Sequence, residues 1–450
     1  MRKISDSIWF QIYPALCFLH LIGSIGVRSL IGWGGFLVVS GALVIGGVIL
    51  FNKARQTKQF SWHFVPHSLL LFLAFATVSI IWSAYRVESL LGITAQLATS
   101  TVAVLLAFLF SWQQLVRALA TSLRYILMLS LLFELYVAAI LHKPLLQGFV
   151  TVNDATNPSE LLYWSRALLF SGGPIQGVIA NSALLGLFAL IALVVFAAQL
   201  LDSETSRCSG WFWISTAALV LLLTRSATVW IALLVVAATA LFALWARRSA
   251  ANRTPVYISG FALLATTTVA ALTLYEPVSK FLGKSPDFTG RFEIWHKVAM
   301  LAQEHPVLGL GWVSHWAPWA EPFASLDTKV GLPVMHAHNA WLDVRLQLGW
   351  VGLVIFTVFV LGTVQRVWCL AVDQPRQGVT ERLPYRAYTM LPLLIMAALL
   401  IQSLTESRLL IESGWLLLVL FATKTTSHYR IPLPAQKSKK LMPYATSVSH

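Results

Sequence analysis

The sequence predicts an all-α fold: a polytopic integral membrane helix bundle of about twelve transmembrane helices, with one long extracytoplasmic loop that contains short helices. Of the 450 residues, 57% are hydrophobic and only 11% are charged. Apolar stretches of about 20 residues, the length that a helix needs to cross a bilayer, recur along the whole chain. Because backbone amides in hydrocarbon must be bonded within their own segment, we expect these stretches to be helices.

Short polar breaks separate the expected spans within a single membrane domain, residues 1–450. The spans cover residues 8–24, 30–51, 65–83, 91–110, 122–141, 174–200, 211–224, 227–246, 255–275, 347–368, 388–404 and 409–423. Their loops alternate in Lys and Arg content, and the positive-inside rule then places both termini in the cytoplasm and residues 276–346 outside. The polar, basic tail 429–450 is expected to be a disordered cytoplasmic segment.

The net charge of +14 would suggest a nucleic-acid partner in a soluble protein. In this chain we interpret it as cytoplasmic anchoring charge, with a contribution from contacts with anionic lipid. We therefore expect membrane lipids as partners and no nucleic acid.

The short break at residues 225–227 decides the topology that follows it. The stretch TRSATVW lies between two apolar runs, which are either two helices or one broken helix. A single helix would invert everything downstream and place the basic stretch RRSAANR outside, so we expect two helices.

Residues 276–346 form the one long polar stretch between the spans, and we expect the chemistry to lie there. Five of the chain's eleven histidines fall in it: His296, His305, His315, His336 and His338.

The first part of this loop, TGRFEIWHKVAMLAQ, predicts a short amphipathic helix on the membrane surface. The apolar residues at helical spacing are Phe292, Trp295, Val298, Ala299 and Ala302. Thr289 or Gly290 can cap it, and the dipeptide His305-Pro306 ends it. Arg291 then lies in the first turn, where a cation opposes the helix dipole. An anionic ligand explains that position, and so does pairing with Glu293 or with lipid headgroups.

The next part, PVLGLGWVSHWAPWAEPF, has Gly309 and Gly311 at a turn and three tryptophans. Trp312, Trp316 and Trp319 are most simply membrane-belt or packing residues. The alternative is stacking on the sugar rings of a substrate or acceptor.

In the last part, HAHNAWLDVRLQLGWVGL, polar residues run straight into the tenth span. Asn339 can cap this helix, which leaves His338 at its outer mouth. Arg345 lies about two turns further on the same face. Ionisable residues at such depth usually face a protein interior or a wet cavity, where an imidazole can accept a proton at neutral pH. His338 is the candidate base, with His336 second.

A metal site has weak support. The pair His336 and His338 has no third cysteine, histidine or acid at a ligand-like spacing. None of the three cysteines lies in the long loop. We therefore expect no metal and no other cofactor.

Other charged residues lie near the spans on the outer side. Arg225 is flanked by apolar runs and suits either a lipid-linked diphosphate or snorkelling to headgroups. Arg166, in the loop 142–173, is a secondary candidate if that loop folds onto the main one; a solvated connector is the alternative. Glu134 is a buried-charge candidate. The cluster Glu406, Arg408 and Glu412 is explained by mutual ion pairing.

The motifs GRFEIW, HPVLGLGW and HAHNAWLDVRLQLGWVGL resemble the bacterial O-antigen ligase and O-antigen polymerase superfamily. The shared pattern is G-R-x-x-x-W, then P-x-x-G-x-G, then H-N-x-x-L before a glycine-ended helix entry. The resemblance covers about residues 285–355. It is weaker at Arg225, where the family tends to show S-R and this chain has Thr224 before the arginine.

This resemblance implies a glycosyltransferase on the outer face of the bacterial cytoplasmic membrane. It would move a glycan from an undecaprenyl-diphosphate carrier to the hydroxyl of a glycan or lipid acceptor, without a metal or a nucleotide sugar. Carried over, Arg225 and Arg291 hold the diphosphate and His338 is the base, so that the anomeric centre inverts. His336 and Arg345 are second candidates. Polymerases and ligases share these motifs. The competing function is a transporter or flippase for lipid-linked sugars.

Overall fold

The computed structural model describes residues 8–55, 62–150, 159–281, 291–329, 332–374, 376–377 and 381–430. Its helices are α2 (Ile8–Ile22), α3 (Ser24–Ala54), α4 (His67–Val78), α5 (Arg86–Leu109), α6 (Trp112–Tyr136), α7 (Ser182–Leu201), α8 (Arg207–Thr224), α9 (Ala227–Arg248), α10 (Thr254–Phe281), α11 (Arg291–Glu304), α12 (Phe323–Leu326), α13 (Ala340–Val372), α14 (Leu391–Ser403) and α15 (Glu412–Arg430). The predicted all-α class is confirmed.

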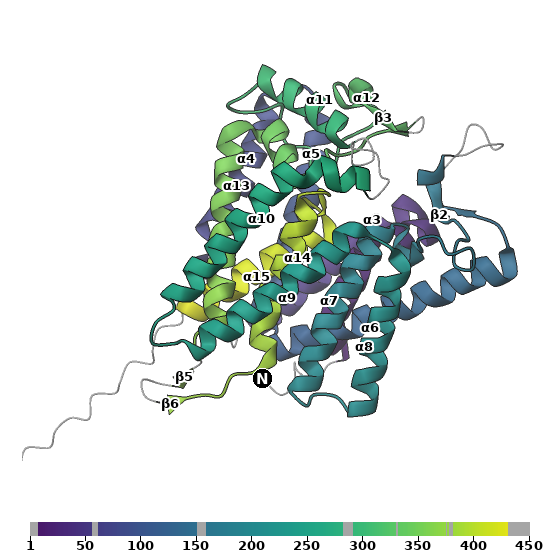
Figure 1. Cartoon of the computed structure of the whole chain (residues 1–450). Coiled ribbons are helices and arrows are strands. Elements are labelled where there is room, and N and C mark those ends of the chain that lie inside the picture. The colour runs from purple at the N-terminus through teal and green to yellow at the C-terminus, as the bar shows by residue number, and fades with distance from the viewer. Residues whose placement is uncertain are drawn as a thin grey trace, which may run out of the picture.

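Strands are confined, in the described ranges, to three antiparallel two-stranded ribbons. They pair β1 (Leu145–Leu146) with β2 (Tyr163–Ser165), β3 (Thr328–Lys329) with β4 (Leu332–Pro333), and β5 (Arg376–Gln377) with β6 (Glu381–Arg382). The β3–β4 ribbon lies with α11 and α12 at one end of the bundle, and β5–β6 lies at the other end (Figure 1).

The bundle has a central core of apolar helices. Helix α7 and the stretch 415–422 of α15 are almost wholly buried, whereas α3 and α10 expose many apolar side chains, as lipid-facing helices do. Figure 1 shows α14 and α15 surrounded by the other helices, with α11 and α12 above them.

Seven of the described helices are long and apolar enough to cross a membrane: α3, α5, α6 with the π-turn that extends it to Leu141, α7, α8, α9 and α13. Helices α2, α4 with its following turn, α10 over residues 254–270, and α14 with its preceding turn are apolar but shorter. Each of the twelve expected ranges coincides largely with a helix, yet the number of spans remains a prediction.

Several boundaries differ from those expected. Helix α10 continues to Phe281, so residues 276–281 are helical rather than part of the outer loop. Helix α15 reaches Arg430 and includes the first two residues of the expected tail; residues 431–450 lie outside the described part. The expected pair of helices around residue 225 is present, because α8 ends at Thr224 and α9 begins at Ala227.

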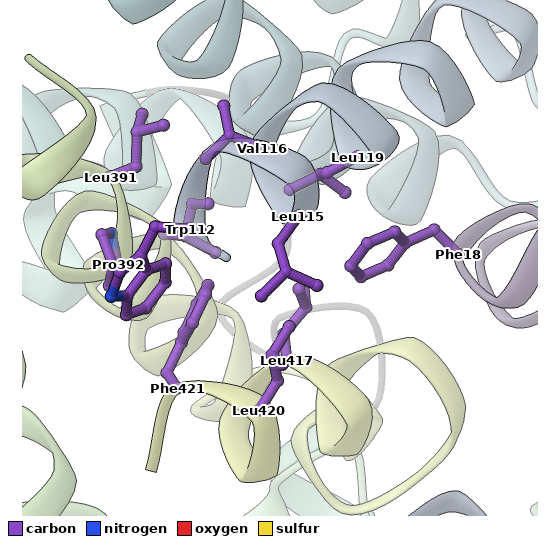
Figure 2. A pocket seen from close by; sticks show the side chains of 11 residues that line it. Phe18, Trp112, Leu115, Val116, Leu119, Leu391, Pro392, Leu417, Leu420 and Phe421 are labelled. Carbon is purple, nitrogen blue, oxygen red and sulfur yellow. The ribbon is translucent and has the colours of Figure 1, made fainter. Parts of the chain in front are cut away.

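An apolar pocket lies between α2, α6, α14 and α15 (Figure 2). Phe18, Leu115 and Leu417 are among its lining side chains, and no ionisable residue lines it. It therefore offers no group for proton transfer or for binding a charged substrate.

Candidate active site

Helix α11 forms as expected but turns a different face to the protein. It ends at Glu304, directly before His305-Pro306, and its proposed caps Thr289 and Gly290 lie outside the described residues. Ile294, Val298 and Ala302 are its buried residues, whereas Phe292 is 40% exposed. The expected apolar face was thus placed wrongly at Phe292, because the bundle packs against the i, i+4, i+8 row that starts at Ile294.

Trp295 ties α11 to the histidine segment. Its indole nitrogen donates a hydrogen bond to the carbonyl oxygen of Ala337 at 2.9 Å. Ala337 is the residue between His336 and His338, so this contact fixes the segment between the two imidazoles. The spacing between Arg291 and Trp295 therefore places the arginine one turn away from that anchor, on the same helix.

The glycine turn, which contains Gly309 and Gly311, packs its backbone closely against α13. That helix is interrupted at Gly349, which has φ +63°. At the interruption the amide N–H of Trp350 donates to the carbonyl of Pro306 at 2.9 Å, and the N–H of Gly311 donates to the carbonyl of Gln347 at 2.8 Å. A Cβ on Gly309, whose φ is +70°, would lie 2.5 Å from the backbone of Gln347. Only glycine permits this approach.

The start of α13 is built as predicted. The Asn339 side chain accepts hydrogen bonds from the N–H groups of Trp341 and Leu342, at 3.0 and 3.2 Å, which satisfies two free donors of the first turn. His338 precedes this cap in a left-handed conformation, with φ +50°. The mouth of the helix therefore presents His338 at a defined backbone position.

Asp343 and Trp341 join this helix start to the segment between α14 and α15. The buried Asp343 carboxylate accepts hydrogen bonds from the Ser407 hydroxyl and, at 3.2 Å, from the N–H of Ala337. The Trp341 indole donates to the Ser403 hydroxyl at 3.1 Å. These contacts hold residues 403–407 beside the histidine segment.

Glu406, in that segment, is the centre of the site. Its carboxylate lies 2.9 Å from the Arg291 guanidinium, 3.4 Å from His338 Nδ1 and 3.8 Å from His336 Nε2. Burial opposes ionisation of Glu406, but His338, His336 and Arg291 outweigh it and hold its pKa at about 2. Glu406 is therefore a carboxylate at neutral pH.

This pairing corrects the expectation for the charged residues of the last hairpin. Arg408 pairs with Glu412 at 2.7 Å, as expected, and Arg28 of α3 pairs with the same carboxylate at 3.0 Å. Glu406 instead pairs with Arg291, a residue distant in sequence. The signal available in the sequence was a carboxylate between two spans on the expected outer side, but nothing in the spacing named its partner.

The histidines form a contiguous row. The ring centroids of His336 and His338 are 4.1 Å apart, and those of His315 and His336 are 5.8 Å apart. Burial lowers the pKa of His315 to about 4, helped by Arg408. Burial and the neighbouring His338 lower the pKa of His336 well below its ordinary value. Both rings are therefore neutral at pH 7.

His336, His338 and Glu406 also offer ligand atoms within 4.8 Å of one another, as a metal site would. However, the N–H of His338 donates to His336 Nδ1 at 3.1 Å, so the proton of the neutral ring lies on Nε2, the nitrogen that faces Glu406. A metal-binding histidine normally donates through its other nitrogen instead. Arg291 would also repel a cation. The three residues therefore fit a metal poorly.

The remaining candidate residues are not joined to this cluster by any hydrogen bond or ion pair among the described residues. Arg225 ends α8 in a left-handed conformation, is exposed, and lies beside Gly172, where an added Cβ would be 3.3 Å from its guanidinium. Arg166 pairs with Glu160 of its own loop at 3.0 Å. Arg345 packs over the Trp350 ring, 4.7 Å from its centroid.

The three tryptophans differ. Trp312 and Trp316 are fully buried and pack against Phe72 and Phe323, with centroid distances of 5.4 and 5.3 Å. Packing, rather than sugar stacking, explains these two. Trp319 is 71% exposed, and its indole donates to Glu88 at 3.0 Å. It is the one of the three with an open ring face.

Glu134 has a structural position. Its carboxylate accepts hydrogen bonds from the Ser165 hydroxyl and from the N–H groups of Gln176 and Gly177, at 2.7 to 2.9 Å. Three donors compensate its burial and anchor the segment that leads into α7.

Comparison with known proteins agrees with the motifs. Residues 212–357 match the family model described as O-antigen ligase. This range includes α11, the glycine turn and the start of α13. No curated protein matches the chain. The family match and the apolar helices support an integral protein of the bacterial inner membrane. The matched family implies glycan transfer of the O-antigen ligase and polymerase type. The match thus supports membership of this chain in the O-antigen ligase and polymerase family.

Proposed function

We propose that the protein is an inverting glycosyltransferase that uses a polyprenyl-diphosphate-linked glycan on the outer face of the membrane. The observation that carries this function is the convergence of Arg291, His336 and His338 on the buried Glu406. A cation beside an imidazole that lies at a helix mouth is what a reaction with an anionic leaving group and a hydroxyl nucleophile needs.

The donor diphosphate would be held by Arg291, whose planar guanidinium suits phosphate oxygens, and by Arg225. Arg225 is exposed and lies beside Gly172, and no ion pair to another described residue holds it away from a ligand. No metal is required if these two cations carry the charge of the leaving group. Both termini would lie in the cytoplasm and the loop 142–173 outside, as the positive-inside rule predicts.

The transfer itself needs one base. His338 Nδ1 faces Glu406, which leaves Nε2 to accept the proton of the acceptor hydroxyl. The hydroxyl oxygen forms a bond to the anomeric carbon as the bond from that carbon to the diphosphate oxygen breaks. Polyprenyl diphosphate leaves with the bonding electron pair. Attack from the face opposite the leaving group inverts the anomeric centre.

The acceptor is a glycan or lipid hydroxyl, and Trp319 offers an exposed ring for stacking on a sugar. A transporter for lipid-linked sugars is not favoured, because the family match is to a transferase.

The test is His338→Ala in proteoliposomes that contain undecaprenyl-diphosphate-linked glycan and acceptor. Loss of the base should lower transfer at least about 100-fold while the protein remains folded. His296→Ala, which removes an exposed imidazole from the same loop, is the matched control and should transfer normally. Full activity of His338→Ala would refute the base. A ladder of longer lipid-linked chains identifies a polymerase, whereas a single shift of the acceptor identifies a ligase.

A further inference from the structure

The partners of Glu406 come from both candidate parts of the site. One buried carboxylate contacts Arg291 of α11 and both imidazoles of the segment before α13. The other carboxylate of the last hairpin, the partly buried Glu412, contacts two arginines and the Ser24 hydroxyl. Glu406 is thus the carboxylate shared between the proposed diphosphate ligand and the proposed base.

The two oxygen atoms of Glu406 divide these partners. Oε1 accepts the hydrogen bond from Arg291 at 2.9 Å. Oε2 faces the histidines, with His338 Nδ1 at 3.4 Å. The contact with Arg291 is short and well aligned, whereas His338 Nδ1 is buried and makes no well-aligned hydrogen bond to any residue that the structure describes. In this state the carboxylate is engaged mainly by the guanidinium.

A diphosphate would change that balance. Phosphate oxygens and a carboxylate compete for the same guanidinium N–H groups. When the ligand takes Arg291, the buried carboxylate needs another donor, because an unpaired charge is costly there. The nearest donor is the Nδ1 proton of His338.

We propose that Glu406 is a positioning residue. In the empty site its carboxylate pairs with Arg291, and when a diphosphate binds Arg291 the carboxylate instead accepts a hydrogen bond from His338. That hydrogen bond orients the imidazole as a base. This inference rests on the proposed function. The imidazole is then oriented as a base only when the donor is present.

The charged and titratable groups around His338 are few. They are Arg291 from α11, His336 from its own segment, Glu406, Asp343 of α13, which accepts from the N–H of Ala337, and beyond His336 the ring of His315 with Arg408 and Glu412. Removal of the Glu406 charge therefore takes away the carboxylate that faces the His338 ring, while Arg291 remains. The protonated imidazole then loses its stabilising partner.

The experiment compares Glu406→Gln with the unchanged protein, full length and in proteoliposomes. Turnover, kcat, should fall about 10- to 100-fold, because the base is no longer oriented. The acidic limb of kcat/KM should move to lower pH by about one unit. The acidic limb of kcat should move further, because the carboxylate contacts His338 most closely in the donor complex.

Binding gives a readout that does not depend on transfer. Undecaprenyl diphosphate without glycan should bind Glu406→Gln about 5-fold or more tightly than the unchanged protein, because Arg291 has lost its competitor and the site has gained a positive charge. A purely structural residue would weaken binding when replaced.

Glu412→Gln is the matched control, since it removes another carboxylate of the last hairpin that pairs with arginines, although its side chain is less buried than that of Glu406. It should leave both acidic limbs in place. Glu406→Asp keeps the charge, so the acidic limbs of its kcat and kcat/KM profiles should lie between those of Glu406→Gln and the unchanged protein. This variant replaces Glu406→Gln in the comparison if Glu406→Gln does not fold. If Glu406→Gln had the same acidic limbs as the unchanged protein and bound undecaprenyl diphosphate more weakly, Glu406 would not be a positioning residue. If His338→Ala were fully active, the proposed function itself would fail instead.

Discussion

The indole nitrogen of Trp295 lies 2.9 Å from the carbonyl oxygen of Ala337 and donates a hydrogen bond to it. This contact joins the surface helix α11 to the segment that carries both candidate histidines. It gives a physical reason for the spacing R-x-x-x-W: the arginine reaches Glu406 while the tryptophan, one turn later, holds the histidine segment in place.

Replacement of Trp295 by Phe tests this link. Phenylalanine keeps an aromatic ring but removes the donor, so we expect transfer to fall about 10-fold through misplacement of His338, with a stability loss of about 1 kcal/mol. Initial rates and thermal unfolding measure the two effects. Met300→Leu changes an exposed residue of the same helix and should alter neither. A fully active Trp295→Phe would show that the anchor is unnecessary.

The glycine turn predicts a stability effect without any change of a polar group. An alanine at Gly309 would place its Cβ 2.5 Å from the Gln347 backbone at a φ of +70°, so both the contact and the backbone conformation are unfavourable. We expect a loss of about 3 kcal/mol or more, seen as a lower unfolding temperature or loss of folded protein. Gly41→Ala, where no atom lies within 4 Å, is the control. Equal stability of the two variants would contradict the close approach.

His315 predicts a pH dependence. Its pKa in the folded protein is about 4, below the ordinary value near 6.5, because burial and Arg408 disfavour the charged ring. Between these pH values the unfolded chain binds a proton that the folded protein does not. The free energy of unfolding should therefore fall by up to about 3 kcal/mol as pH drops from 6.5 to 4.

The variant His315→Gln should lack this part of the acid sensitivity. Unfolding temperatures across the pH range, for the two proteins in one detergent, give the comparison. His305→Gln, at an exposed histidine of the same loop, should keep the full slope. If His315→Gln lost stability as steeply as the unchanged protein, the buried neutral ring would not be its source.

Chelation tests the metal alternative. His336 Nδ1 accepts a hydrogen bond from a backbone N–H, and the Glu406 carboxylate is paired with Arg291. Because these groups are already engaged, we expect EDTA treatment to leave the rate of transfer unchanged within about two-fold. The measurement is the initial rate before and after dialysis against the chelator. Loss of transfer that zinc or manganese restores would assign a metal to His336, His338 and Glu406.

Local sequence patterns predicted the parts of the site that depend on neighbours in the chain. The cap at Asn339, the end of α11 before Pro306 and the separate helices on either side of Arg225 all follow from capping, proline and charge rules. The face of α11 was predicted less well. Helical periodicity identifies rows of apolar residues, but which row is buried depends on the bundle beneath it.

Long-range contacts could not be predicted in the same way. Glu406 pairs with a residue more than 100 positions earlier, and its sequence neighbour Arg408 was the natural expected partner. For Trp312, Trp316 and Trp319 the sequence favoured belt or packing roles and left sugar stacking as the alternative, and only the fold shows that the first two are in the core. Burial of a side chain is a property of the packed structure, and a loop sequence does not encode it alone.

The sequence by itself determined that this is a helical membrane protein with one chemically distinctive polar segment, because hydrophobic length and local capping act over a few turns of chain. It also placed Arg291 and His338 in that segment. Only the tertiary structure decided that the two meet at Glu406. A buried carboxylate must find cationic or hydrogen-bonding partners in three dimensions, and packing of α11, α13 and the α14–α15 connection brings them within reach.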